Sequence, residues 1–137
     1  MIKLFYCCLL ALPLRHMVLT SGYGYRVHPV TGQFCFHSGV DLQARHDTLF
    51  AVMPGHVAFV GYDRLTGLHI RLASGDFTLL YGHLSQVFVL AGDSVNSYTP
   101  LGITGSSGRV TGEHLHFSVS YRQVPVNPLL FLNRLLH

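Results

Sequence analysis

Two histidines, His114 and His116, stand two residues apart in a run of β-type residues that continues to Tyr121. Successive side chains of a strand point to opposite faces, so these imidazoles share one face while Leu115 and Phe117 take the other. Imidazole is a common neutral metal ligand and titrates near neutral pH. The alternative interpretation is a surface strand that carries two histidines by chance, so the pair needs partners from elsewhere in the chain.

A second candidate contribution is the segment from His37 to Asp41, which places one imidazole and one carboxylate four residues apart. This offset puts both side chains on one face of a strand or a helix, although the pair alone is weak evidence. With His116 it gives two nitrogen donors and one oxygen donor and leaves a fourth position open, the pattern of a catalytic zinc site. Such ligands, with no required thiolate, fit zinc better than an iron–sulfur cluster or cuprous copper.

The third piece is Tyr81-Gly82-His83-Leu84, which follows an apolar stretch that begins at Asp76. We expect His83 to stand at the end of a buried strand, from which its side chain can reach a cleft. The alternative is a capped histidine within the core. The chain holds ten histidines against six Asp and Glu residues, so any acid–base chemistry is expected to fall to histidine.

The composition indicates one globular domain. The 137 residues are 49% hydrophobic and only 11% charged, which argues against disorder. The net charge is +3 and the nine Lys and Arg residues are scattered, so we expect no nucleic-acid partner. A weakly basic surface suits an anionic polymer such as a bacterial cell wall. The three cysteines, Cys7, Cys8 and Cys35, indicate no disulfide framework.

The N-terminal residues 1–12 combine one positive charge with a short apolar run. This pattern predicts either an export signal or the first apolar segment of the domain, with a single domain over residues 13–137. The run is too short to cross a membrane as a helix, so we expect no stable transmembrane segment. We also expect the protein to be a monomer.

The many glycines and prolines cut the chain into short pieces and favour strands over helices. Strands are predicted over residues 16–20, 34–41, 49–53, 55–62, 68–73, 76–81, 86–91, 100–104 and 114–121. Only the tail from Asn127 to Leu136 is predicted to be helical, with Asn127 as its cap and Pro128 in the first helical position. The expected fold is therefore all-β and antiparallel, with a short C-terminal helix.

Together these pieces resemble the lysostaphin and LytM type of zinc metallopeptidases, which cut the peptide bridges of bacterial peptidoglycan. The resemblance rests on three motifs in the expected order: H-x-x-x-D over 37–41, Y-x-H-L over 81–84 and H-x-H over 114–116. It extends from about Leu12 and includes residues 21–29, 51–57, 101–108 and 126–128. It implies a small antiparallel β-sheet domain with a substrate groove across the sheet.

The resemblance also implies a role for each residue. His37, Asp41 and His116 would be ligands of one Zn²⁺ per chain, and His83 and His114 would be the catalytic histidines beside it. Zinc lowers the pKa of its bound water to about 7, and the two histidines would move the protons. The implied substrates are peptidoglycan peptides, and the implied location is extracytoplasmic, periplasmic or secreted.

The remaining candidates are weaker. Cys35 is expected to share the strand face of His37, most simply as an inert buried thiol. Arg26 and His28 are candidates for the wall of the groove, and Arg109 is a candidate partner for a substrate carboxylate. Glu113 is expected to point away, and the other histidines are read as surface or filler residues: His16, His46, His56, His69 and His137.

Two other functional classes compete with the peptidase. One is a non-catalytic cell-wall-binding or regulatory domain of the same fold, in which ligands or catalytic histidines are generally lost. The other is a metal-buffering protein, which a single open site disfavours. All five positions are intact here, so the sequence favours the enzyme.

Overall fold

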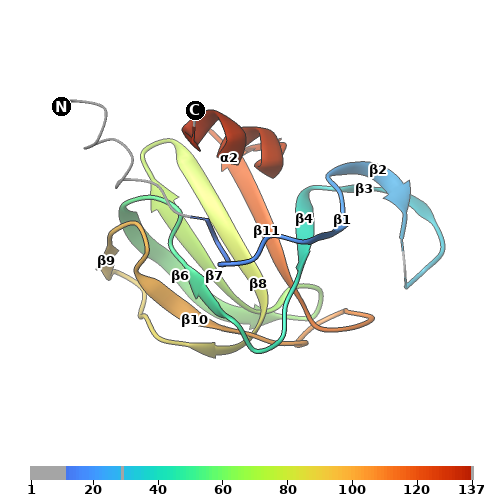
Figure 1. Ribbon diagram of the computed structural model, residues 1–137, viewed down its shortest axis with the longest axis horizontal. Coiled ribbons are helices and arrows are strands. Elements are labelled where there is room, and N and C mark those ends of the chain that lie inside the picture. The colour runs from blue at the N-terminus through green and yellow to red at the C-terminus, as the bar shows by residue number, and fades with distance from the viewer. Residues whose placement is uncertain (1–11, 29, 137) are drawn as a thin grey trace.

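The computed structural model describes residues 12–28 and 30–136. Its strands are β1 (Leu19–Ser21), β2 (Gly24–Val27), β3 (Phe34–His37), β4 (Gly39–Gln43), β5 (Thr48–Phe50), β6 (Gly55–Asp63), β7 (Gly67–Ser74), β8 (Phe77–Val87), β9 (Ser94–Val95), β10 (Pro100–Thr104), β11 (His114–Tyr121) and β12 (Val124–Val126). One helix, α2 (Pro128–Leu136), follows β12 near the end of the chain (Figure 1). The predicted all-β antiparallel fold with a short C-terminal helix is confirmed.

The main sheet has the order β1-β4-β11-β8-β7-β6-β9, with β10 paired to both β5 and β8 and with β12 paired to β11. Strand β11 therefore lies between β4 and β8, and all three run antiparallel to their neighbours. The β2–β3 hairpin is a separate two-stranded sheet that projects beyond β4 (Figure 1). An open pocket lies at the junction between this hairpin and the β4–β11–β8 part of the main sheet.

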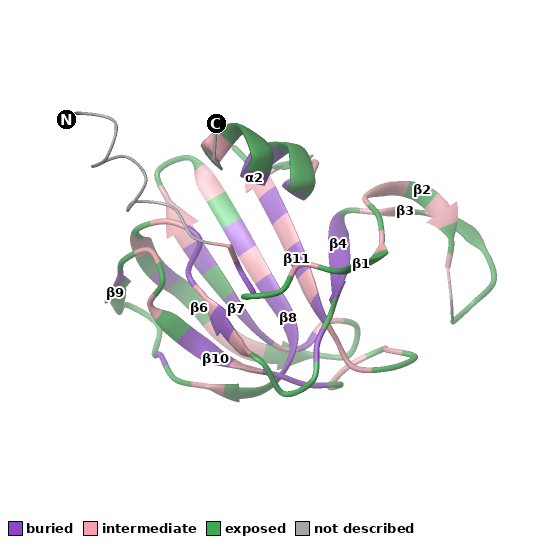
Figure 2. Ribbon diagram, viewed as in Figure 1, coloured by how far each residue is buried: buried purple, intermediate pink, exposed green. Residues whose placement is uncertain are grey.

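The core lies under one face of the main sheet. Along β11, the side chains of Leu115, Phe117 and Val119 are fully buried, whereas those between them are only half-buried. Figure 2 shows this alternation, and it fixes the register because a slip of one residue would expose the apolar set. The hydroxyl of buried Tyr81 accepts a hydrogen bond from the Val52 N–H at 3.1 Å, so this aromatic side chain also ties β8 to the loop after β5.

Helix α2 closes one end of the molecule. The Asn127 side-chain oxygen accepts a hydrogen bond from the Leu129 N–H at 3.0 Å, and Pro128 is the first helical residue, as the sequence predicts. Phe131 and Leu132 are buried, and the Phe131 ring lies 5.0 Å from that of Phe77 on β8. The helix is thus held by apolar contacts on one face.

Two sequence predictions about β8 are wrong. The segments 76–81 and 86–91 were expected to be separate strands, but one strand runs from Phe77 to Val87. His83 therefore lies within this strand rather than at its end. The expected break reflects Gly82 and the exposed polar residues Ser85 and Gln86, which interrupt the apolar pattern without ending the backbone pairing to β7 and β10.

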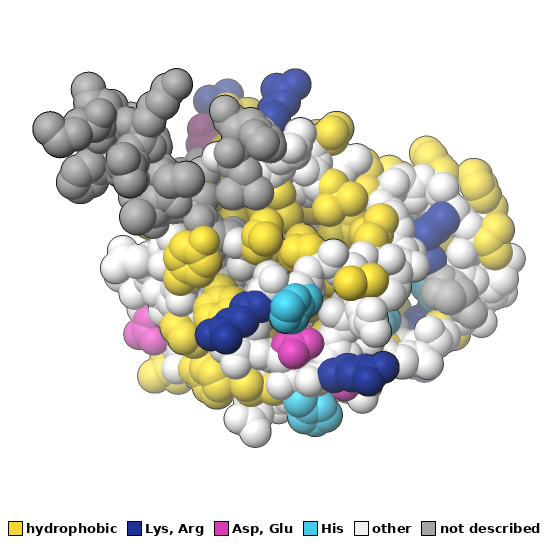
Figure 3. All heavy atoms as spheres, viewed as in Figure 1, with side chains coloured by type: hydrophobic (Ala, Val, Ile, Leu, Met, Phe, Trp, Pro, Cys, Tyr) yellow, Lys and Arg dark blue, Asp and Glu magenta, His cyan; other side chains and the backbone are white. Residues whose placement is uncertain are grey.

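The predicted export segment, residues 1–12, lies outside the described residues except for Leu12. Within the described part of the chain, no helix is both long and apolar enough to cross a membrane. On the face shown in Figure 3, the Lys and Arg side chains are dispersed among hydrophobic and neutral ones, and hydrophobic side chains line the outer side of the β2–β3 hairpin.

Candidate metal centre

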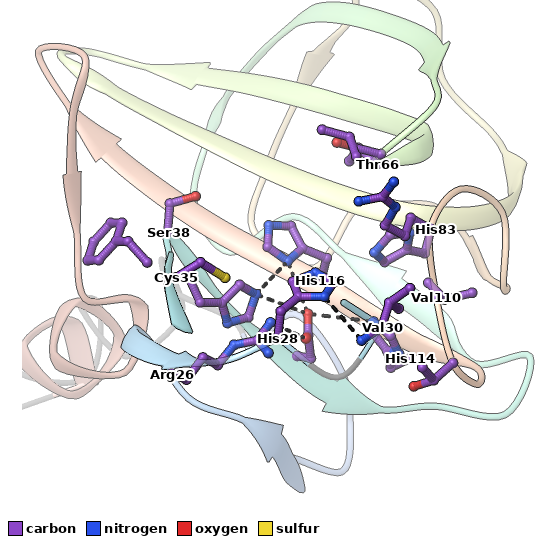
Figure 4. A pocket seen from close by; sticks show the side chains of 16 residues that line it. Arg26, His28, Val30, Cys35, Ser38, Thr66, His83, Val110, His114 and His116 are labelled. Carbon is purple, nitrogen blue, oxygen red and sulfur yellow. Dashed lines mark hydrogen bonds and ion pairs between the residues drawn. The ribbon is translucent and has the colours of Figure 1, made fainter. Parts of the chain in front are cut away.

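The strand register brings the three predicted motifs together. His116 on β11 is directly opposite Asp41 on β4 and, on its other side, opposite Gly82 on β8. His37 ends β3 two residues before β4 begins, and His83 follows Gly82. All of the predicted site residues line one open pocket between the hairpin and the sheet (Figure 4).

Three donor atoms converge at this point. His116 Nδ1 lies 3.0 Å from Asp41 Oδ1 and 3.3 Å from His37 Nε2, and His37 Nε2 lies 3.5 Å from Asp41 Oδ1. Zinc bonds of about 2.0–2.1 Å in tetrahedral geometry place neighbouring donors roughly 3.3 Å apart, so this donor set fits zinc. Among the described residues, His37, Asp41 and His116 form the one group of this kind.

Backbone contacts fix the orientation of the donors. The Nδ1–H of His37 donates to the Gly22 carbonyl at 2.9 Å, which leaves its Nε2 lone pair free for a metal. Gly39 lies against the His116 ring, because a Cβ placed there would come within 2.8 Å of His116 Cε1. The ring is therefore held by close packing as well as by the strand.

Asp41 is the charged member of the group and is only 7% exposed. Burial alone would raise its pKa, but hydrogen bonds and charge interactions with His116 and His37 outweigh burial and hold the pKa well below its usual range. The carboxylate therefore stays ionised at neutral pH, which is the form that can bind a divalent cation.

His83 and His114 lie beside this group, with their ring centroids 4.9 Å apart. The Nδ1–H of His83 donates to the Ser107 carbonyl at 2.7 Å, so its Nε2 is left as a proton acceptor. Burial lowers the pKa of His83 to about 4 and also lowers the pKa of His114. Both imidazoles are thus neutral at pH 7, which is the form that can take up a proton.

A β-bulge turns His83 into the pocket. Between β7 and β8, Gly82 and His83 together oppose the single residue His69, and His83 has a φ of 62°. Its N–H leaves the ladder and donates to the Thr66 carbonyl at 2.7 Å. Bulges re-aim side chains in this way, and Gly82 fits here because a Cβ would lie 2.5 Å from Thr66 Cγ2.

The weaker candidates are placed as follows. Arg26, His28 and Arg109 line the pocket, and Cys35 lines it on the same side as His37 but is half-buried rather than fully buried. Glu113 is turned away from the pocket.

None of the described histidines that were expected to be surface or filler residues lines the pocket. His69 is buried and bonded to the Gly67 carbonyl, whereas His16, His46 and His56 are exposed and His137 is outside the described residues. Ser107 and Gly22, which orient the imidazoles through their carbonyls, could not be found from the sequence because a backbone carbonyl carries no residue-type signal.

The pocket brings together two imidazole nitrogens, a buried carboxylate and two further neutral imidazoles, which are residue types that a metallopeptidase site requires. The comparison with protein families agrees: the sequence model described as peptidase family M23 matches residues 35–128. The chain belongs to this family, and its resemblance to the lysostaphin and LytM type is confirmed.

Curated relatives share this region. The chain is 38% identical over 120 residues to the DD-carboxypeptidase/endopeptidase Mpg of Neisseria meningitidis serogroup B, covering 85% of this chain and 27% of the relative. It is 34% identical over 105 residues to the peptidoglycan DD-endopeptidase ShyC of Vibrio cholerae, covering 75% of this chain and 24% of the relative. The chain spans about a quarter of the length of these relatives.

Solved structures show the same fold. A zinc-containing peptidase from Vibrio cholerae superposes with a TM-score of 0.80 at 29% identity, covering 88% of this chain and 39% of the other. The catalytic domain of lysostaphin from Staphylococcus simulans superposes with a TM-score of 0.77 at 28% identity, covering 85% of this chain and 92% of the other. The second match covers nearly the whole of the lysostaphin catalytic domain.

Proposed function

We propose that this protein is a zinc-dependent endopeptidase that hydrolyses peptide cross-links or stem peptides of bacterial peptidoglycan. The observation that carries the proposal is the convergence of three metal donors, 3.0–3.5 Å apart, beside one buried and one half-buried neutral imidazole in an open groove. The relatives named as peptidoglycan DD-endopeptidases support the substrate class. Because peptidoglycan lies outside the cytoplasmic membrane, the proposed site of action is extracytoplasmic.

In this proposal, residues 13–137 act as one metallopeptidase domain, and His37, Asp41 and His116 hold one Zn²⁺. Zinc, when bound, supplies a Lewis acid that polarises a carbonyl and makes a water molecule acidic at neutral pH. The ionised Asp41 balances part of the metal charge, and the hydrogen bond from His37 to Gly22 keeps the Nε2 atom directed at the site.

The two remaining imidazoles handle protons. His114 is suited to accept a proton because its Nε2 lies 3.6 Å from Asp41 Oδ1, where a carboxylate stabilises the imidazolium that forms. The same proton can then pass to the leaving amine. His83 is oriented by its hydrogen bond to the Ser107 carbonyl, and its Nε2 is a second proton acceptor in the same pocket. Glu113 takes no part, because its carboxylate accepts a hydrogen bond from the His46 backbone N–H at 2.7 Å instead.

The test is to incubate the purified protein, with its zinc content measured, with peptidoglycan fragments of several cross-link types and to identify any cleaved bond by mass spectrometry. We expect cleavage at a peptide bond, and we expect none from His114→Ala at equal zinc content. A zinc-loaded wild type that binds peptidoglycan without cleaving any cross-link type would instead be a non-catalytic wall-binding domain and would overturn the proposal.

A further inference from the structure

Arg26 reaches the metal centre from the separate β2–β3 hairpin. It lies on β2 opposite Cys35 and lines the same pocket as the three donor residues (Figure 4). Its Nη2 lies 3.9 Å from Asp41 Oδ2, and its Nη1 donates to the Val27 carbonyl at 3.5 Å. The guanidinium is therefore the cation nearest to the buried carboxylate among the described Lys and Arg side chains.

The two oxygens of Asp41 have different surroundings. Oδ1 faces the imidazoles of His37, His114 and His116 at 3.0–3.6 Å. Oδ2 faces Arg26, on the other side of the carboxylate. A carboxylate anchored through one oxygen can turn less about its own axis, and so the other oxygen keeps its direction.

The Nε–H of Arg26 supplies an independent observation. This atom is buried and has no hydrogen-bond partner among the described residues. Nε and Nη2 form one edge of the planar guanidinium, which is the edge that pairs with a carboxylate through two parallel hydrogen bonds. The edge that contains the unpaired Nε is thus the edge that already contacts Asp41.

We propose that Arg26 is a positioning residue of the metal centre, which holds Asp41 Oδ2 so that Oδ1 remains directed at the metal. The inference rests on the metal centre of the proposed function. It links the hairpin to the main sheet, since the hairpin then provides both a ligand, His37, and the anchor of a second ligand, Asp41. Groups that orient metal ligands typically change metal affinity by about 10–100-fold when they are removed.

The experiment measures the zinc Kd of the purified wild type, Arg26→Met and Arg26→Lys by competition with a chromophoric chelator, and records the visible spectrum of each Co²⁺-substituted protein. The matched control is Arg122→Met, which removes another Arg–Asp pair, Arg122–Asp76, on an exposed surface. We expect Arg26→Met to weaken zinc binding about 10–100-fold and to alter the Co²⁺ bands, with Arg26→Lys recovering part of the loss. Arg122→Met should match the wild type.

Three outcomes would overturn the inference: an unchanged Kd for Arg26→Met, an equal loss in Arg122→Met, or no recovery in Arg26→Lys. An unchanged Kd with a raised KM would make Arg26 a substrate-binding residue instead. If Arg26→Met does not fold, Arg26→Gln takes its place. The readout requires no peptidoglycan, so a wild type that binds zinc and cleaves nothing refutes the proposed function alone, whereas a wild type that binds no zinc refutes both.

Discussion

Gly39→Ala is expected to damage the metal centre without removing a ligand. A Cβ on residue 39 would lie 2.7 Å from the Phe117 carbonyl oxygen and 2.8 Å from His116 Cε1. Ordinary contact begins at 3.4 Å, so the distance to the β11 backbone must grow by about 0.7 Å and that to the ring by about 0.6 Å. Such overpacking costs about 1–3 kcal/mol of unfolding free energy. A site must keep its ligands within about 0.5 Å of their working positions, so we expect zinc affinity to fall as well.

Urea unfolding of the metal-free proteins measures the change in unfolding free energy, and chelator competition measures the change in zinc affinity. Gly112→Ala is the matched control, because nothing lies within 4 Å of its added Cβ and its φ is not in the left-handed region. We expect the control to change the free energy of unfolding by less than about 0.5 kcal/mol and to keep the wild-type Kd. A Gly39→Ala protein with wild-type stability and wild-type zinc affinity would refute the close packing of His116 against β4.

Two further predictions concern stability. Tyr81→Phe leaves the buried Val52 N–H without an acceptor, so we expect a loss of about 1–3 kcal/mol in urea unfolding, whereas exposed Tyr25→Phe should be neutral. The folded-state pKa of His83 is about 4, below the 6.5 of the unfolded chain, so the folded state binds fewer protons between these values and stability falls as pH is lowered from 6.5 to 4. This loss should be smaller in metal-free His83→Gln, and an equal loss would contradict the desolvation of His83.

Much of the fold follows from local pattern. The alternation along residues 114–121 predicts the strand, its buried face and the shared face of the two histidines, and Asn127-Pro128 predicts the start of the helix. The β2, β9 and β12 strands were missed, because each is only two to four residues long, too short for a pattern to stand out. Such short segments become strands by pairing with other strands, and this pairing depends on residues that are distant in the sequence.

The candidate site likewise has features that the sequence predicts and features that it does not. The three motifs, H-x-x-x-D, Y-x-H-L and H-x-H, name all five residues that the structure gathers in one pocket. The β-bulge at His83 and the Arg26–Asp41 contact could not be predicted, since the first depends on the β7–β8 register and the second on how a separate hairpin docks. Both are tertiary features.

The most direct test of the proposed metal centre compares His116→Ala with His114→Ala for zinc content and peptidoglycan cleavage in the same preparation. The two histidines share one strand face but differ in their proposed roles. We predict that His116→Ala loses both zinc and activity, whereas His114→Ala retains about one zinc per chain and loses only activity. Zinc retained in His116→Ala, or lost in His114→Ala, would contradict the division of the site into metal ligands and proton-transfer residues.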